Sequence, residues 1–287
     1  MKKVLILGGA NMVGYGITRS FIETTDLKNY RIRAMVEPRQ YGITKATSEV
    51  FDKVSVEFYN PVPTDMETMD KICTKTIETK PDYIINCFEY RDFSRPQISL
   101  YHNTVFPHAL ASWAKECSVP LIHISTDHVF GGKAGDYLES RTPAPIDKYG
   151  ISKQLGEPPG CMVLRAGVIG PELQAKTGFY EWIFSHKGES IQGFTDQVWN
   201  GMTSKELGKL CIKIIDKNLY AEGVNHLFSP HKTSKADIIK MISGVNNLQI
   251  KIKPTSSDNP KNRSLASDSS LCESLGVSPL LKQIREL

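Results

Sequence analysis

The sequence of 287 residues lacks several features that would define a protein class at once. No apolar run approaches the ~20 residues of a membrane-spanning helix. The short apolar run at 4–7 follows two lysines but ends at Gly8, which is too early for a secretory signal. No two of the six cysteines lie within three residues of each other, so no CxxC pair is present for zinc or redox chemistry. We therefore expect a cytoplasmic protein without a disulfide framework and without a metal site.

The sequence also has little excess charge of either sign. The formal net charge is +4 and the isoelectric point is about 8.6, with lysines and arginines dispersed along the chain. A nucleic-acid-binding protein would carry a stronger basic stripe, so we expect no nucleic acid and no membrane as partner. A small anionic ligand needs only a few cations. A homodimer is compatible with the sequence, which does not define the oligomeric state.

Strand-like and helix-like patterns alternate over the first 165 residues. Short buried-strand patterns occur at 3–7, 31–36, 54–58, 83–86 and 121–124, and a long helix is expected at 99–117. This alternation predicts βαβ units and an α/β Rossmann fold, with a doubly wound, mostly parallel sheet.

The regular alternation of strand and helix patterns ends at about residue 165, after which the segments are shorter and Gly and Pro are more frequent. We predict a nucleotide-binding domain over 1–165, with a return segment at about 195–225. A smaller, interleaved substrate-binding part is expected over 166–194 and 226–287.

A glycine-rich turn separates the first strand from the first helix. Its spacing is Gly8-x-x-Asn11-x-x-Gly14, with asparagine where dinucleotide-binding loops have their middle glycine. Asparagine tolerates the left-handed region better than most residues, so we expect the turn to survive. The N–H groups of Met12 and Val13 at the helix start would then bind the diphosphate of NAD(H) or NADP(H). A glycine turn that only packs the helix on the sheet is the alternative.

The end of the second strand gives conflicting signals on the choice of cofactor. Glu37 suits the free ribose 2′-hydroxyl of NAD, whereas Arg39 suits the 2′-phosphate of NADP. The preference stays open.

Three residues predict an acid–base site at the carboxyl edge of the sheet. Thr126 ends a strand, and Tyr149 and Lys153 lie four residues apart on one face of a helix. A free tyrosine has a pKa of about 10, and a nearby ammonium group would lower it toward neutrality. The Thr126 hydroxyl could bond the substrate oxygen. An ordinary solvated helix is the alternative.

Several segments resemble, in order and over nearly the whole chain, one branch of the short-chain dehydrogenase/reductase superfamily. This is the extended, sugar-nucleotide-modifying branch, and the match is to its dTDP-4-dehydrorhamnose reductase-like group. The matching segments are Ser125–Phe130, Tyr149–Glu157, Leu164–Gly170, Trp199–Thr203 and Asn262–Leu265.

The resemblance implies an oxidoreductase that reduces the C4 ketone of a nucleoside-diphosphate-4-keto-6-deoxyhexose with NAD(P)H. A dTDP-linked rhamnose precursor and a UDP-2-acetamido-2,6-dideoxyhexulose are equally suitable substrates. Tyr149 would protonate the incipient alkoxide, Lys153 would lower the Tyr149 pKa and bind the nicotinamide ribose, and Thr126 would orient the ketone.

Further contacts are implied by the same resemblance, each beside a plain structural alternative. Cofactor contacts are expected from Glu57, Phe58, Cys87, Phe88 and Asn103. Asn103 would support Lys153 through water. Substrate contacts are expected from Asp127, His128, Trp199 and Arg263, with Arg263 clamping the diphosphate. The lysines at 251, 253 and 261 are expected on a solvated face.

Other functions remain open. A 4-epimerase, or a 3- or 5-epimerase that also reduces C4, uses the same Tyr–Lys pair, and Cys87 with His128 could supply the acid and base for epimerisation. Asp127 is followed by His128 where 4,6-dehydratases have a second carboxylate, which argues against dehydration. A non-catalytic NADP-binding regulator or sensor is the third option, because the regulatory subunit of methionine adenosyltransferase resembles the same group.

Overall fold

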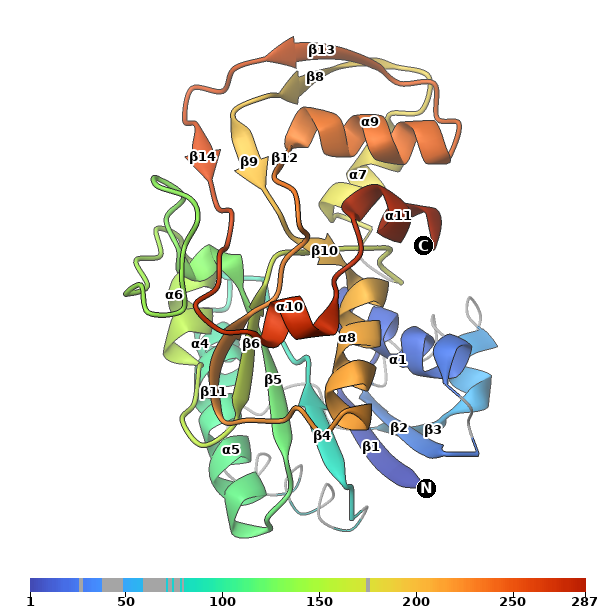
Figure 1. Ribbon diagram of the computed structural model, residues 1–287, viewed down its shortest axis with the longest axis vertical. Coiled ribbons are helices and arrows are strands. Elements are labelled where there is room, and N and C mark those ends of the chain that lie inside the picture. The colour runs from blue at the N-terminus through green and yellow to red at the C-terminus, as the bar shows by residue number, and fades with distance from the viewer. Residues whose placement is uncertain are drawn as a thin grey trace.

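A seven-stranded parallel sheet forms the centre of the protein in the computed structural model (Figure 1). The structure describes residues 1–25, 28–37, 49–58 (at 57 and 58 the backbone only), 71, 74, 78, 80–173 and 176–287. The strand order is β11-β6-β5-β4-β1-β2-β3, and every neighbouring pair is parallel. The strands are β1 (Lys2–Leu7), β2 (Tyr30–Val36), β3 (Ser55–Phe58), β4 (Tyr83–Asn86), β5 (Leu121–Thr126), β6 (Met162–Ala166) and β11 (Gly223–His226). The predicted α/β Rossmann fold is confirmed.

The strand order reverses between β1 and β4, the switch point at which open α/β sheets bind their ligands. Alternate residues of β1 serve the two faces of the sheet. Val4 and Ile6 pack under α1 (Met12–Thr24) and α8 (Ser204–Asp216), while Leu5 and Leu7 pack under α5 (Phe106–Glu116). Both faces are therefore apolar and covered, which explains why β1 reads as a continuous hydrophobic run.

The long helix expected at 99–117 is interrupted. Its place is taken by α4 (Pro96–Leu100), the π-helical turn η2 (Tyr101–Val105) and α5. Shorter helices elsewhere are η1 (Glu49–Lys53), η3 (Asp127–Val129) and α6 (Lys148–Leu155). Within the described part of the chain, no helix has the length and apolar character needed to cross a bilayer.

A second group of elements lies beyond the carboxyl ends of the strands, at the end of the molecule opposite the N-terminus (Figure 1). Strand pairs and a three-stranded sheet are formed by β7 (Val168–Ile169) with β10 (Met202–Thr203), β8 (Ser190–Phe194) with β13 (Lys251–Thr255), and β9 (Gln197–Trp199) between β12 (Thr233–Ser234) and β14 (Lys261–Asn262). The helices are α7 (Phe179–Ser185), α9 (Lys235–Val245) and α11 (Leu280–Arg285). This group has its own apolar core, which includes Ile183, Ile238, Ile242 and Ile284. Helix α10 (Leu271–Leu275) lies instead beside α8 and β11 and packs on the core of the central sheet (Figure 1).

Glycines bring α1 and α8 into close contact on one face of the sheet. A Cβ atom at Gly16 would lie 2.3 Å from the Ser204 hydroxyl oxygen, and one at Gly208 would lie 2.8 Å from the Ile17 Cα. The Ser20 hydroxyl donates to the carbonyl of Gly16 and to that of Lys205, which joins the two helices. The helix pair therefore depends on the absence of side chains at the crossing.

Gly208→Ala should lower the free energy of unfolding by about 1–3 kcal/mol, because the added methyl group meets the backbone of α1. Gly244→Ala in α9 is the matched control, since a Cβ there has no atom within 4 Å and alanine favours a helix by about 0.5–1 kcal/mol. Urea unfolding of both variants measures the difference. Equal stability of the two variants would show that the helices can separate at no cost.

Candidate active site

A cleft of about 390 Å³ lies between the carboxyl edge of the sheet and the C-terminal group of elements. It is lined from the sheet side by strand ends and by α6, and from the other side by β9, α9 and β14. The predicted site residues that line it are Val13, Cys87, Thr126, Asp127, His128, Tyr149, Lys153, Trp199 and Arg263. Residues that are distant in sequence thus meet in one cavity.

The glycine-rich turn is formed differently from the expectation. Asn11 has φ −75°, in the extended region, and the left-handed residue is Gly8 at φ +74°. Asn11 instead caps α1, because its Oδ1 accepts a hydrogen bond of 2.8 Å from the Gly14 N–H. Its Nδ2 donates to the carbonyl of Cys87 at 2.5 Å, which ties the turn to the end of β4. The asparagine is therefore used for its side-chain hydrogen bonds, and the backbone tolerance that we invoked is not needed.

The turn brings the start of α1 close to the end of β1. A Cβ at Gly14 would lie 2.2 Å from the Gly8 carbonyl oxygen, so only glycine permits this approach of helix to strand. The Gly14 N–H is capped, while the N–H groups of Met12 and Val13 in the first helical turn have no carbonyl partner within the helix. Such donors, at the positive end of a helix, are suited to bind phosphate oxygens.

Part of the predicted cofactor site lies outside the described residues. Glu37 follows β2 and is half-buried, but Arg39 falls in an undescribed segment. Glu57 and Phe58 are placed only through their backbone, in β3 opposite Met35 and Val36.

Cys87 and Phe88 behave differently from each other. The Cys87 side chain lines the cleft, and burial raises the pKa of its thiol well above the usual value. A thiol that keeps its proton is not available as the base of an epimerisation, although it could still act as the acid. The Phe88 side chain packs in the core, with its ring centre 5.2 Å from that of Phe106, and its expected contact with the cofactor stays a prediction. The apolar ring fits the hydrophobic layer between sheet and α5.

Asn103 is fully buried in the π-helical turn η2 and holds the neighbouring loop. Its Oδ1 accepts from the Tyr90 N–H and its Nδ2 donates to the Tyr90 carbonyl, both at 2.8 Å. The same Nδ2 lies 3.0 Å from the Ser152 hydroxyl on α6. These bonds occupy the side-chain amide, which therefore fixes the loop after β4 and joins it to α6.

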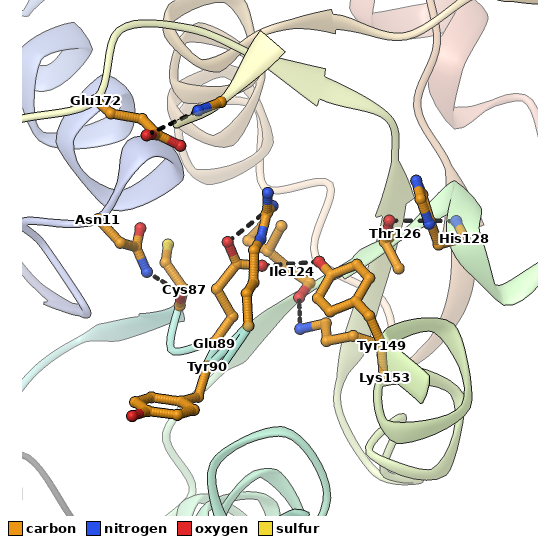
Figure 2. Close-up of polar contacts among 12 residues, drawn as sticks. Asn11, Cys87, Glu89, Tyr90, Ile124, Thr126, His128, Tyr149, Lys153 and Glu172 are labelled. Atoms are coloured by element: carbon orange, nitrogen blue, oxygen red, sulfur yellow. Dashed lines mark hydrogen bonds and ion pairs between the residues drawn. The ribbon is translucent and has the colours of Figure 1, made fainter. Parts of the chain in front are cut away.

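Lys153 is buried at the centre of the site (Figure 2). Helix α6 begins at Asp147, whose side chain caps the Gly150 N–H at 2.7 Å. One turn later, the Lys153 ammonium group donates to the Ile124 carbonyl on β5 at 2.8 Å. Burial lowers the pKa of Lys153, while the carboxylates of Glu89 and Glu157 act in the opposite direction.

Tyr149 contacts two groups that the sequence analysis missed (Figure 2). Its hydroxyl donates to Glu89 Oε2 at 2.8 Å, and Arg91 Nη2 lies 2.9 Å from Glu89 Oε1. Burial raises the pKa of Tyr149, the Glu89 carboxylate raises it further, and Arg91 and a hydrogen bond to Thr126 only partly compensate. The Lys153 ammonium group is directed at the Ile124 carbonyl, and its expected lowering of the Tyr149 pKa stays a prediction.

A signal for Glu89 and Arg91 existed in the sequence. Both follow Asn86, the last residue of β4, at the same sheet edge that drew attention to Thr126. The rule that points to Thr126 and to Cys87 therefore also points to this charged pair.

His128, Asp147 and Arg263 form one hydrogen-bonded cluster at the edge of the cleft. His128 Nδ1 lies 3.3 Å from Asp147 Oδ2, and its Nε2 lies 3.3 Å from Arg263 Nη1. Arg263 also donates through Nε to the Phe130 carbonyl at 3.1 Å. The guanidinium is thus fixed by protein partners on one side and lines the cleft on the other.

Two further cations line the same wall. Lys235 at the start of α9 and Lys261 in β14 join Arg263, and burial together with these two neighbours lowers the pKa of Lys235. The expectation that Lys261 belongs to a solvated face is wrong. Trp199 also lines this wall. Its indole ring packs so closely on Gly167 and Gly201 that a Cβ atom at either position would lie 2.0 or 1.9 Å from it.

Comparison with known proteins supports one family. The family model described as "RmlD substrate binding domain" matches residues 1–275. The "Probable low-salt glycan biosynthesis reductase Agl14" of Haloferax volcanii is 28% identical over 197 residues, which is 63% of this chain and 65% of that protein. "Methionine adenosyltransferase 2 subunit beta" of Danio rerio is 28% identical over 177 residues, 56% of this chain and 53% of that protein. The matches thus span less than two thirds of these relatives.

The fold is shared with solved structures. The dTDP-4-dehydrorhamnose reductase of Bacillus anthracis in complex with NADP has a TM-score of 0.74 at 20% identity, covering 100% of this chain and 98% of that one. The family model extends over the sheet, the cleft and most of the C-terminal group, so the assignment does not rest on the nucleotide-binding half alone. The chain belongs to the RmlD substrate binding domain family.

Proposed function

We propose that this protein reduces the C4 ketone of a nucleoside-diphosphate-4-keto-6-deoxyhexose with NAD(P)H. The observation that carries the proposal is the placement of Thr126, Tyr149 and Lys153 in one cleft whose opposite wall is cationic. The names of the relatives, a glycan biosynthesis reductase and a dTDP-4-dehydrorhamnose reductase with NADP, support it. A dTDP-linked and a UDP-linked 2-acetamido sugar remain equal candidates.

Residues in different parts of the cleft would have different roles in this reaction. The Gly8–Gly14 turn and the start of α1 would hold the cofactor diphosphate, and a bound nicotinamide would supply a hydride to the carbonyl carbon. Tyr149 would give its hydroxyl proton to the oxygen, and Thr126 would orient that oxygen from β5. Lys153 is anchored to Ile124 by one of its three N–H donors, which leaves two for the cofactor ribose.

The cationic wall would bind the substrate diphosphate. Lys235, Lys261 and Arg263 all come from the C-terminal group of elements, and Trp199 stands beside them as a flat apolar surface for the base or the sugar. The division into a cofactor-binding part over 1–165 and 195–225 and a substrate-binding part over 166–194 and 226–287 belongs to this proposal.

One relative favours a second candidate function. The similarity to methionine adenosyltransferase 2 subunit beta suits a non-catalytic regulator that binds NADP and a protein. A regulator has no use for a proton donor beside a threonine hydroxyl in a cleft. The presence of Thr126, Tyr149 and Lys153 together therefore favours the reductase.

Enzymatically prepared dTDP- and UDP-4-keto-6-deoxyhexoses should each be tested with NADH and with NADPH at 340 nm. We expect one mole of reduced cofactor to be oxidised per mole of sugar with one substrate class. An epimerase would convert the sugar without net oxidation of cofactor, and a bifunctional enzyme would also exchange deuterium at C3 or C5. Cofactor binding by calorimetry without any turnover would count against the reductase and for the regulator.

Tyr149→Phe should lower kcat by about 10²–10⁴-fold, because it removes the proton donor and leaves the ring in place. Cofactor binding, measured by calorimetry, should change little. If the variant retains full turnover, the proton comes from another group and the assignment of Tyr149 is wrong.

Lys261→Gln should raise KM about ten- to a hundredfold with a small effect on kcat, because a charge-assisted hydrogen bond to phosphate contributes about 1.5–3 kcal/mol. Lys253→Gln is the matched control, since Lys253 is exposed and does not line the cleft. Steady-state kinetics of both variants gives the comparison. Equal KM values in the two variants would place the diphosphate elsewhere.

A further inference from the structure

The pair Glu89 and Arg91 is not explained by the proposed reaction. Glu89 is largely buried, with 13% of its side chain exposed, and its carboxylate bonds Tyr149 on one oxygen and Arg91 on the other. The Arg91 guanidinium lies 5.1 Å from the centre of the Tyr149 ring and is half-exposed. A buried carboxylate that accepts the proton-bearing hydroxyl of the predicted donor must affect how that hydroxyl ionises.

The contact is held in place by the backbone. Asn103 bonds both the N–H and the carbonyl of Tyr90, the residue between Glu89 and Arg91, at 2.8 Å. Through Ser152 the same amide reaches α6, the helix that carries Tyr149. The loop with the carboxylate and the helix with the phenol are therefore joined by a buried bridge, and their distance does not depend on the Glu89 side chain alone.

Groups from four elements face the Tyr149 hydroxyl and ring. The loop after β4 supplies Glu89 and Arg91, and β5 supplies the Thr126 hydroxyl. The His128 ring from η3 lies 5.6 Å from the ring of Tyr149, edge to face. Lys153 on α6 itself directs its ammonium group to Ile124. Two charged groups thus lie at the Tyr149 hydroxyl: the Glu89 carboxylate, which accepts its hydrogen bond, and the Arg91 guanidinium, which also lies within hydrogen-bond reach of Tyr149.

We propose that Glu89 is a positioning residue that keeps Tyr149 in its protonated, proton-donating form into the alkaline range. The acceptor oxygen of Glu89 bonds the phenol but would repel the phenolate, because two negative charges would then lie at hydrogen-bond distance. Arg91 keeps Glu89 ionised: burial raises the pKa of this carboxyl, but the charges of Arg91 and Lys153 hold it below the usual value. The consequence for catalysis rests on the proposed function, whereas the ionisation of Tyr149 does not.

The sign of the pH dependence follows from the proton that Tyr149 donates. Reduction requires the phenol, so it proceeds below the Tyr149 pKa and is lost as pH rises through it. The reverse oxidation requires the phenolate and rises over the same range. Removing the Glu89 charge favours the phenolate, so the alkaline loss of reduction should move to lower pH.

The direct test is NMR of the cofactor-free protein labelled with [13Cζ]tyrosine, with Tyr149→Phe to assign the signal. In the wild type, Tyr149 should remain a phenol beyond pH 10, where an ordinary tyrosine is half ionised. Glu89→Gln should lower its apparent pKa by about 1–3, the size of effect expected for a close charge. In the double variant E89Q/R91Q the apparent pKa of Tyr149 should lie between that of the wild type and that of E89Q, because this variant also lacks the guanidinium that favours the phenolate.

Glu189→Gln is the control, since this carboxylate is exposed and outside the cleft, and it should leave the Tyr149 signal unchanged. If the unpaired Arg91 prevents E89Q from folding, the double variant removes both charges and carries the test. The inference is overturned if Tyr149 of the wild type ionises at or below pH 10. It is also overturned if Tyr149 ionises at no lower pH in E89Q and in E89Q/R91Q than in the wild type.

Kinetics then separates the two proposals. In E89Q the alkaline limb of kcat/KM for reduction should move to lower pH, with KM little changed. Absence of any turnover would defeat the proposed function and leave the NMR result standing. Turnover with an unmoved limb and an unmoved NMR titration would defeat the role of Glu89 alone.

Discussion

The buried hydrogen bond from the Lys153 ammonium group to the Ile124 carbonyl is the interaction on which the site depends. An ammonium group inside a protein is costly unless it is paired and hydrogen-bonded. Here the carbonyl at the end of β5 and the carboxylates of Glu89 and Glu157 provide that environment. Because the bond joins α6 to β5, it also sets the position of Tyr149 relative to Thr126. The chemistry of the cleft is thus a consequence of how one helix is attached to the sheet.

A second buried hydrogen-bond network joins β5 to β6 next to Thr126. The Ser125 hydroxyl donates to Glu157 Oε1 at 2.6 Å, and Arg165 on β6 bonds both oxygens of Glu157, at 2.8 and 2.7 Å. The two charged side chains are only 5% and 8% exposed. Breaking such a pair costs about 3–5 kcal/mol, because one charge is left buried without a partner. The pair therefore fixes the register of β5 and β6 immediately next to Thr126, and Glu157 serves both this network and Lys153.

Local patterns allowed much of this to be predicted from the sequence. The alternation of strands and helices gave the fold, and the i,i+4 spacing of Tyr149 and Lys153 gave the helix face. Glu89 was missed because it meets Tyr149 across 60 residues, through a loop whose path depends on Asn103 and an interrupted helix. No periodicity encodes that path. Lys261 was misplaced for a related reason, since the side of a strand or loop that a residue faces depends on packing partners from other segments.

The cleft combines two charge environments that come from different parts of the chain. Carboxylates lie near the reacting end, where Glu89 contacts Tyr149 and Asp127 follows Thr126, whereas Lys235, Lys261 and Arg263 come from the C-terminal group. On the proposed function, the cations would bind the charged half of the substrate, and the neutral ketone would be presented to the sheet edge. A substitution in β14 or α9 would then change which nucleotide sugar binds without disturbing the proton donor. A substitution at Glu89 or Asn103 would act on the proton alone, because the loop after β4 contacts α6 and is tied to it through Ser152. The two charge environments meet where Arg263 contacts His128 and Asp147, because Asp147 caps α6 and the His128 ring lies against Tyr149.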